Sequence, residues 1–187
     1  MRSSIQRTRT RHRRDDLRAL RPDAGRHCSD GGKPVNVTSL NRYEIKVSKT
    51  DYKCISVNGK PTEHFIAPDT KAKTQKIYVL KNTEEIYYVG VTSLSMSSRL
   101  RSGYRAKGEH GYHGYKWIGK ISRAELLVWC FTKSHRSRAE AIEGELVYLV
   151  RNRTGKWPKY QMEIHFHPGV SDKEKQIAET LANICLE

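Results

Sequence analysis

The sequence predicts an α+β fold: a small, mainly antiparallel three-stranded sheet flanked by helices, with an N-terminal β-hairpin and a C-terminal helix as additions. Two observations lead to this prediction. From residue 75 to residue 168, segments of strand and helix character follow in the order strand, strand, helix, strand, helix. Residues 42–58 alternate apolar and polar positions, which is typical of strands. The 187 residues fit one ordinary domain with an extension.

Residues 1–35 are expected to form a disordered basic arm. Residues 7–16 contain five arginines, and little apolar material follows them. Such a segment buries too little surface to offset the entropy of ordering it. Three interpretations stay open: an arm that tracks along DNA, an extension from a misassigned start codon, and an organellar transit peptide. Asp15, Asp16 and Asp23 weaken the last, because transit peptides are poor in acidic residues.

Residues 36–74 are expected to form an N-terminal extension. The alternation at 42–58 predicts a β-hairpin or two short strands that end at Asn58-Gly59. Pro61 and Pro68 then indicate a linker.

Two strands open the core, with the sequences KIYVLK and EIYYVGV, and they carry Tyr78 and Tyr88. Side chains alternate between the two faces of a strand, so these tyrosines share a face only if their registers differ by an even number. We predict a three-residue loop at Asn82–Glu84, which would pair Tyr78 directly with Tyr88.

The next helix is predicted to begin at Ser93 or Ser95, because either side chain can cap it. Its apolar positions recur every four residues, at Met96, Leu100 and Tyr104. The glycine-rich stretch GEHGYHGYKWIG is expected to be a loop, and ELLVWCF a central strand.

Residues 137–153 give the clearest helical pattern. Ser137 is expected to cap this helix, with Glu140 as its capping-box partner. Gly155 and Pro158 are expected to end it. The buried stripe is predicted at Ala139, Ile142, Leu146, Leu149 and Val150, with Glu143 and Val147 along one edge. A short last strand is expected within 159–168, and a C-terminal helix within 169–187.

The charge balance points to a polyanionic partner. The chain has 35 Lys and Arg against 20 Asp and Glu, a formal charge of +15, which favours nucleic acid. A solvated basic surface and a ribosome-associated protein are the alternatives. None of the four cysteines forms a C-x-x-C pair, which argues against a thiolate zinc site. No apolar run approaches the ~18–20 residues that span a membrane, and no signal-peptide pattern is present. We expect a cytoplasmic protein with reduced thiols.

Five short motifs occur in a specific order along the core. They are Lys76-Ile77-Tyr78, Tyr88-Val89-Gly90, Arg99, the pattern Ala139-x-x-x-Glu143-x-x-Leu146-Val147, and Pro158-Lys159-Tyr160-Gln161. Together they resemble the GIY-YIG nuclease family over roughly residues 75–165, about half the chain. The chain departs from the family where Lys76 replaces a glycine and Gln161 an asparagine.

The resemblance implies a role for each motif residue. Tyr78 would be the general base or would orient the attacking water, and Tyr88 would position the water or the phosphate. Arg99 would clamp the scissile phosphate, since its guanidinium donates to two oxygens at once. Glu143 would bind one divalent metal, Mg²⁺ (or Mn²⁺), because a single carboxylate with waters suits Mg²⁺.

One further position departs from the family, which usually has His or Tyr four residues after the arginine. Here that position is Gly103. Tyr104, His110 and His113 are the candidates to replace the missing group, although Tyr104 also fits core packing. For contacts with the DNA backbone, the candidates are Arg101, Arg105, Lys116 and Gln161.

The sequence therefore predicts a compact, restriction-like, metal-dependent endonuclease that hydrolyses DNA phosphodiester bonds. A homodimer would allow it to cut both strands. The first alternative is a non-catalytic nucleic-acid-binding protein with a degenerate nuclease site, motivated by Lys76, Gly103 and Gln161. The second is a basic protein on ribosomal RNA.

Overall fold

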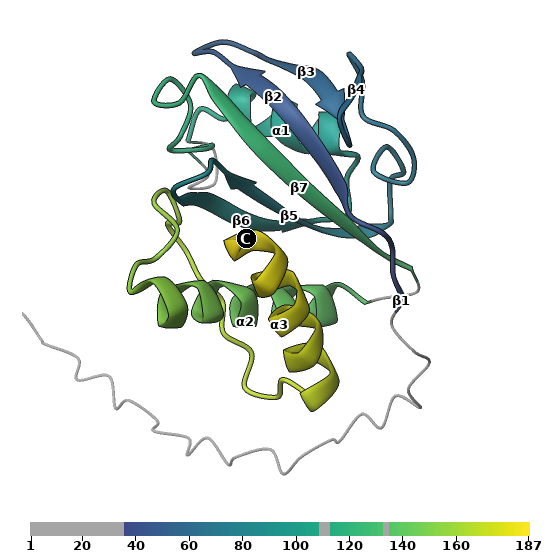
Figure 1. The fold of residues 1–187 in the computed structure, drawn as a ribbon, viewed down its shortest axis with the longest axis vertical. Helices are drawn as coiled ribbons and strands as arrows, with labels where there is room; N and C mark the ends of the chain where they lie inside the picture. The colour runs from purple at the N-terminus through teal and green to yellow at the C-terminus, as the bar shows by residue number, and fades with distance from the viewer. Residues whose placement is uncertain (1–35, 109–112, 133–134) are drawn as a thin grey trace, which may run out of the picture. The chain divides into compact units, whose positions relative to one another are not determined.

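One antiparallel sheet organises the computed structural model, which describes residues 36–108, 113–132 and 135–187 (Figure 1). Its seven strands are β1 (Asn36–Val37), β2 (Asn41–Val47), β3 (Tyr52–Val57), β4 (Lys60–Pro61), β5 (Gln75–Lys81), β6 (Ile86–Thr92) and β7 (Arg123–Thr132). The helices are α1 (Met96–Arg105), α2 (Arg136–Thr154) and α3 (Asp172–Leu186). The expected α+β class is confirmed, and the predicted arm at residues 1–35 lies outside the described residues.

The predicted three-stranded sheet is too small. The strand order is β4-β3-β2-β7-β5-β6, and β1 extends β2 along the same neighbour, β7. The hairpin β2–β3 is therefore part of the main sheet, because β2 pairs with β7 from Asn41 opposite Val128 to Lys46 opposite Arg123. The prediction of β7 as a central strand is confirmed: its apolar run is buried on both faces and paired on both edges.

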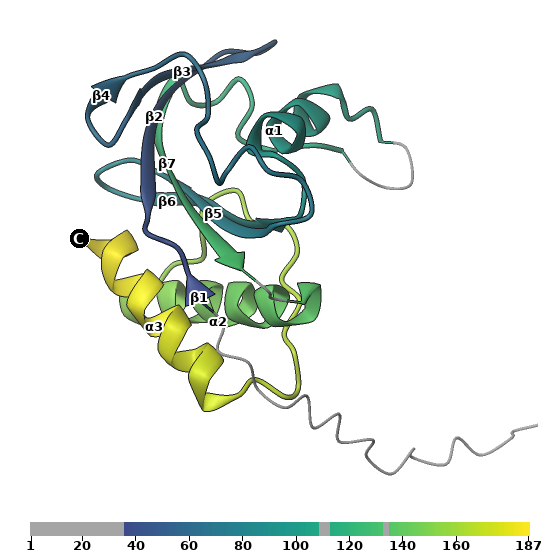
Figure 2. The same ribbon diagram turned by 90° about the vertical axis from the view of Figure 1, so that its right-hand side faces the viewer.

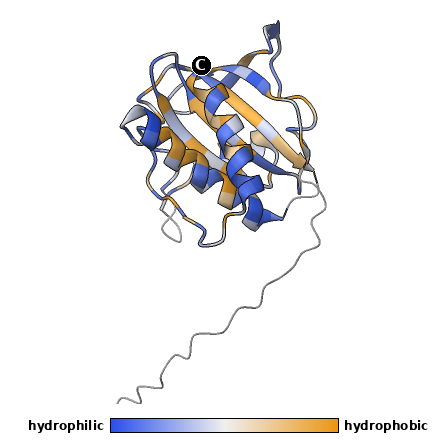
Figure 3. Ribbon diagram, turned by 60° about the horizontal axis from the view of Figure 1, so that its bottom comes forward, coloured by the Kyte–Doolittle hydropathy of each residue, from blue (hydrophilic) through white to orange (hydrophobic). Residues whose placement is uncertain are grey.

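The sheet separates two apolar cores. Helix α1 covers one face, and α2 and α3 together cover the other (Figure 2). Side chains of β5 alternate between them, since Ile77 and Val79 pack toward α2 and α3 while Tyr78 and Leu80 pack on the α1 side. Apolar residues concentrate on the strands and on the inner sides of the helices (Figure 3).

The helix boundaries agree with most of the sequence signals. Helix α1 begins after Ser95, whose side chain accepts a hydrogen bond from the N–H of Ser98. Helix α2 ends at Gly155 in a left-handed conformation, φ 73°. Its start was wrongly predicted: it follows His135, and Ser137 lies inside the first turn. Glu140 instead pairs with Arg136 on the same helix, 2.6 Å away.

The predicted pairing of Tyr78 with Tyr88 is wrong. Tyr78 lies opposite Gly90, and Tyr88 lies opposite Leu80. The loop has four residues, Asn82–Glu85, and the Asn82 side chain closes it by accepting hydrogen bonds from the N–H groups of Glu84 and Glu85. A bulge beside Leu80 absorbs the extra residue of β6. The two tyrosines are offset by two positions, so they still share a face.

The predicted last strand within 159–168 is also absent from the described residues, where this segment is irregular. It follows the outer edge of β6 only briefly: the N–H of Lys159 donates to Ile86 and the N–H of Tyr160 donates to Tyr87, at 3.0 and 2.8 Å. It then leaves the sheet and passes over α2. There Gly144 permits the close approach, since a Cβ would lie 2.8 Å from the His165 carbonyl oxygen.

The expected C-terminal helix is confirmed as α3. It starts with a capping box between Ser171 and Glu174 that the sequence analysis did not single out. Among the helices of the described residues, none combines the length and the apolar character that a membrane crossing requires.

Candidate functional site

Tyr78 and Tyr88 come together beside Gly90, on the α1 side of the sheet. Tyr78 is 1% exposed, and its ring centroid lies 5.9 Å from that of the half-buried Tyr88. A Cβ on Gly90 would lie 2.6 Å from both rings. The glycine of the Tyr88-Val89-Gly90 motif is therefore required by the packing, because only a residue without a side chain leaves room for the Tyr78 ring.

Arg99 points from α1 toward these tyrosines. Its Nε–H donates to the Tyr78 hydroxyl at 3.0 Å. Its guanidinium carbon also lies 5.5 Å from the ring centroid of Tyr115, which favours a cation–π interaction. The structure thus joins two residues that the sequence analysis proposed for one site, Tyr78 and Arg99.

Tyr115 also lies in this arrangement, although no sequence motif indicated it. Its hydroxyl lies 3.1 Å from the Tyr78 hydroxyl and donates to the Arg99 carbonyl oxygen at 3.4 Å. Its ring stacks on Trp117 at 4.7 Å and meets the Tyr88 ring edge-on at 5.5 Å. Tyr115 comes from the loop between α1 and β7, the same glycine-rich loop in which His110 and His113 were proposed.

Two glycines admit Tyr115 into the site, and they were the available signal in the sequence. A Cβ on Gly103 would lie 2.1 Å from the Tyr115 ring. Gly114, at φ +72°, packs so closely that its Cβ would lie 2.2 Å from the Gly103 carbonyl oxygen. Gly103 therefore marks the position on α1 where the Tyr115 ring occupies the space of a helix side chain.

Burial sets the protonation state of Tyr78. It raises the pKa of the phenol well above its usual value near 10, and the neighbouring Tyr115 raises the pKa further. Arg99 acts in the opposite direction but does not outweigh them. In this arrangement Tyr78 is a neutral hydroxyl that exchanges hydrogen bonds, and not a phenolate.

Glu143 lies on α2, on the opposite side of the sheet, and interacts with the edge strand β6. Alternate residues of this edge strand direct their backbone groups outward. The N–H of Val89 donates to the Gln161 side chain at 3.1 Å, and the N–H of Val91, two residues on, interacts with Glu143. The charge of Arg99 also acts on Glu143. Charged residues of helices on the two faces of the sheet, Arg99 on α1 and Glu143 on α2, thus influence each other electrostatically.

The Glu143 carboxyl has an unusually high proton affinity. Burial, followed by repulsion from Glu140, raises its pKa to about 7. Arg99, the Val91 N–H and Arg136 lower the pKa and only partly compensate. A partly buried carboxyl of this kind is stabilised in its charged form when a cation binds in place of the proton.

A divalent ion at this position would take few ligands from the protein. Within residues 36–108, 113–132 and 135–187, no group of three or more His, Cys, Asp and Glu side chains could hold a metal ion. Glu143 would supply one carboxylate, and water or substrate oxygens would supply the rest. This donor set fits Mg²⁺, which keeps much of its hydration shell.

Tyr104 and His113, two of the candidates predicted to assist Tyr78, make other contacts. Tyr104 contacts the β2–β3 hairpin instead of Tyr78: its hydroxyl donates to the Ser48 carbonyl oxygen at 3.3 Å, and burial raises its pKa to about 12. Its aromatic neighbours are Tyr52 and Trp117. His113 is exposed and lies against Gly108. His110 falls outside the described residues.

The proposed DNA-contacting residues occupy two kinds of position. Arg101, Arg105 and Lys116 are exposed on α1 and the loop that follows it. Gln161 has a structural contact instead, since its Oε1 accepts from Val89 and its Nε2 donates to the Glu163 carbonyl oxygen at 3.0 Å. It therefore holds the irregular segment against β6.

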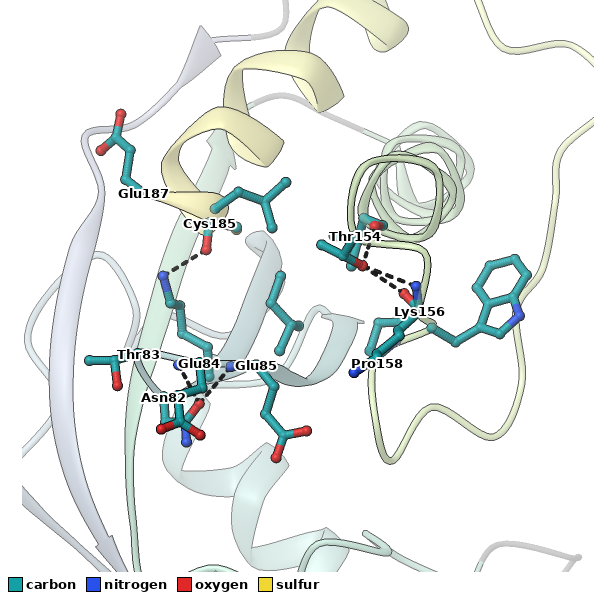
Figure 4. Close-up of a pocket in the computed structure, with 14 residues that line it drawn as sticks. Asn82, Thr83, Glu84, Glu85, Thr154, Lys156, Pro158, Cys185 and Glu187 are labelled. Atoms are coloured by element: carbon teal, nitrogen blue, oxygen red, sulfur yellow. Dashed lines mark hydrogen bonds between the residues drawn. The ribbon is translucent and has the colours of Figure 1, made fainter.

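A separate pocket lies where the β5–β6 loop meets the ends of α2 and α3 (Figure 4). Several of its polar groups have structural partners. Lys81 donates to the Cys185 carbonyl oxygen at 2.6 Å, which suits the negative end of α3. Thr154 donates to the Val150 carbonyl oxygen at 2.8 Å. This pocket contains no part of the tyrosine and arginine arrangement.

Comparisons of the chain with protein-family models, with curated proteins and with solved structures gave no match.

Proposed function

We propose that this chain is a metal-dependent endonuclease that hydrolyses DNA phosphodiester bonds at a GIY-YIG-like site. The observation that carries the proposal is the 3.0 Å hydrogen bond that Arg99 donates to the buried Tyr78 hydroxyl. The charge of the same Arg99 also lowers the pKa of Glu143. A permanent cation, a phenol and a partly buried carboxyl come from three separate elements, α1, β5 and α2. Together they match the needs of phosphoryl chemistry.

Hydrolysis of the backbone adds one water to phosphorus and breaks one P–O ester bond. The attacking water gives up a proton, and the leaving oxygen gains one. A divalent ion held by Glu143 would lower the pKa of a bound water and offset negative charge on the phosphate. The high proton affinity of Glu143 supports this role, because a bound cation would compensate the buried charge.

The protein groups then orient the substrate. Arg99 would hold a non-bridging phosphate oxygen, and Tyr78 would fix the direction of the guanidinium through its Nε. Tyr78 would work as a neutral, water-orienting hydroxyl, since burial raises its pKa. Tyr88 is half-buried beside it and would contact the phosphate or the water.

DNA would approach over α1. The exposed Arg101 and Arg105, with Lys116 on the following loop, would contact backbone phosphates. The formal charge of +15 favours such a partner. A homodimer would bring two sites to a duplex and permit cleavage of both strands.

The test is cleavage of supercoiled plasmid DNA in Mg²⁺, Mn²⁺ or EDTA. The wild type is expected to nick or linearise the plasmid only with a metal, and Glu143→Ala to lose about 100-fold or more in rate. Glu145→Ala is the matched control, because it removes a carboxylate from a different face of the same helix. Equal rates for wild type and Glu143→Ala, or no metal-dependent cleavage, would refute the enzyme proposal.

A second candidate is a non-catalytic nucleic-acid-binding protein. The 1% exposure of Tyr78 and the presence of Lys76 at the motif glycine favour it. It predicts tight DNA binding in EDTA with no cleavage in any metal. The same plasmid and a gel-shift measurement on a short duplex distinguish the two.

A further inference from the structure

We infer that Tyr115 is the positioning residue for Tyr78, supplied by the loop after α1 in place of a side chain on α1 itself. The inference rests on the proposed nuclease function. It concerns a residue that none of the sequence motifs includes, and it assigns the glycine-rich loop a part in the chemistry.

The two glycines show that the replacement is built into the backbone. Any side chain at position 103 would overlap the Tyr115 ring, because even a Cβ would lie 2.1 Å from it. The loop backbone reaches this depth only because Gly114 has no Cβ against the Gly103 carbonyl oxygen. The helix and the loop therefore compete for one space, and the loop occupies it.

Three hydrogen bonds connect Tyr78, Arg99 and Tyr115. Arg99 Nε–H donates to the Tyr78 oxygen at 3.0 Å, and the Tyr115 hydroxyl donates to the Arg99 carbonyl oxygen at 3.4 Å. The two hydroxyls lie 3.1 Å apart, and either of them can be the donor. This cycle of hydrogen bonds begins and ends at Arg99, and it holds the Tyr78 hydroxyl beside Tyr115.

Removing the Tyr115 hydroxyl would break this cycle of hydrogen bonds with little effect on packing. In Tyr115→Phe the aromatic ring can still stack on Trp117 and lie beneath the Arg99 guanidinium. The buried Tyr78 hydroxyl would lose the Tyr115 hydroxyl as a hydrogen-bond partner and would turn to another group. Tyr78 would then no longer hold Arg99 in the same direction.

The test is a double-mutant cycle in the steady-state cleavage of a short duplex in Mg²⁺. Tyr115→Phe is expected to lower kcat about 10- to 100-fold with KM nearly unchanged. Tyr78→Phe should lower kcat at least as much. If Tyr115 acts through Tyr78, the double variant is no slower than Tyr78→Phe alone. Losses that multiply would overturn the inference, and so would an unchanged kcat in Tyr115→Phe.

The controls separate this inference from the proposed function. Tyr104→Phe removes a hydroxyl from the same aromatic cluster, which bonds to Ser48 and not to Tyr78, so its kcat is expected to match the wild type. Gly103→Ala should lower kcat as Tyr115→Phe does, because the methyl group displaces the Tyr115 ring. Thermal unfolding of each variant identifies any general loss of structure. A wild type that never cleaves refutes the nuclease, whereas a cleaving wild type with a fully active Tyr115→Phe refutes only the role of Tyr115.

Discussion

At the scale of single residues, missing side chains determine the geometry of the site. Gly90 leaves room for the Tyr78 ring, and Gly103 and Gly114 leave room for Tyr115. Interiors are packed densely enough that one added methyl group must displace a neighbour. These glycines are therefore as necessary to the arrangement as the polar residues that they admit.

Gly90→Ala is expected to displace the rings of Tyr78 and Tyr88 and to abolish their shared geometry. Overpacking of this kind costs about 1–3 kcal/mol of stability, and DNA cleavage should fall with it. Chemical unfolding and the plasmid assay measure the two effects. Gly169→Ala is the control, since nothing lies within 4 Å of its Cβ and both properties should stay at wild-type values. A fully stable and active Gly90→Ala would contradict the packing argument.

The sequence indicated some neighbours in the candidate site and missed others. Tyr78 and Arg99 were expected together, and the structure joins them by a hydrogen bond, while Arg99 also acts electrostatically on Glu143. Tyr115 was missed because its role depends on a close approach between Gly103 and Gly114, which periodicity cannot reveal. The ordinary explanation, an aromatic residue in a loop, suited the sequence equally well.

At the scale of elements, one carboxylate connects α2 to α3. Glu174 lies in the first turn of α3, where its side chain accepts hydrogen bonds from the Ser171 N–H at 2.9 Å and from Arg138 of α2 at 2.7 Å. Burial alone would raise its pKa, but the bonds from Arg138 and Ser171 outweigh burial and hold the pKa below its usual range. The same residue thus caps one helix and anchors it to the other.

This shift gives the stability of the protein a dependence on acid. Because the folded-state pKa of Glu174 is depressed, its contribution is present above the unfolded pKa of about 4.3 and is lost as pH falls through the folded value. Urea unfolding from about pH 6 down to about pH 3 is expected to show a shallower loss for Glu174→Gln than for the wild type. Asp172→Asn, exposed on the same turn, should keep the wild-type slope. Parallel curves for wild type and Glu174→Gln would disprove this account.

Elements were predictable where local signals agreed with tertiary contacts. The strands β5, β6 and β7 and all three helices of the described residues were expected. The strand predicted within residues 159–168 was wrong, because side-chain alternation alone does not create a strand. After Tyr160, the Gln161 side chain takes the outward N–H of Val89, and the backbone of the segment turns away from β6.

At the scale of the whole molecule, the sheet joins parts that the sequence presented as separate. Alternation identified the β2–β3 hairpin, but it could not identify the partner of β2, which is β7. Pairing between distant strands depends on burial of both faces, a property of the folded chain and not of a local window. The hairpin therefore shares a core with α1, through Tyr43, Ile45 and Leu100.

The charge of the whole chain yields a prediction about salt. Binding of a short duplex in EDTA is expected to weaken steeply as salt rises, because each phosphate contact releases a counterion. Arg101→Ala combined with Arg105→Ala should reduce the slope of log affinity against log salt by about 2. Lys173→Ala with Lys175→Ala removes two exposed charges from α3, behind the opposite face of the sheet, and should leave the slope unchanged. If both double variants had the same slope, α1 would not be part of the DNA-binding surface.

The covering of β6 has a consequence for solubility. An uncovered edge strand offers its backbone to other chains and promotes aggregation. Here Lys159, Tyr160, Gln161 and Glu143 occupy the outward backbone groups of β6. The other end of the sheet is closed by β4, only two residues long and containing Pro61. The contacts of residues 159–161 and Glu143 with β6 therefore limit self-association through this edge, and loss of the 159–161 contacts would expose a strand able to recruit further copies.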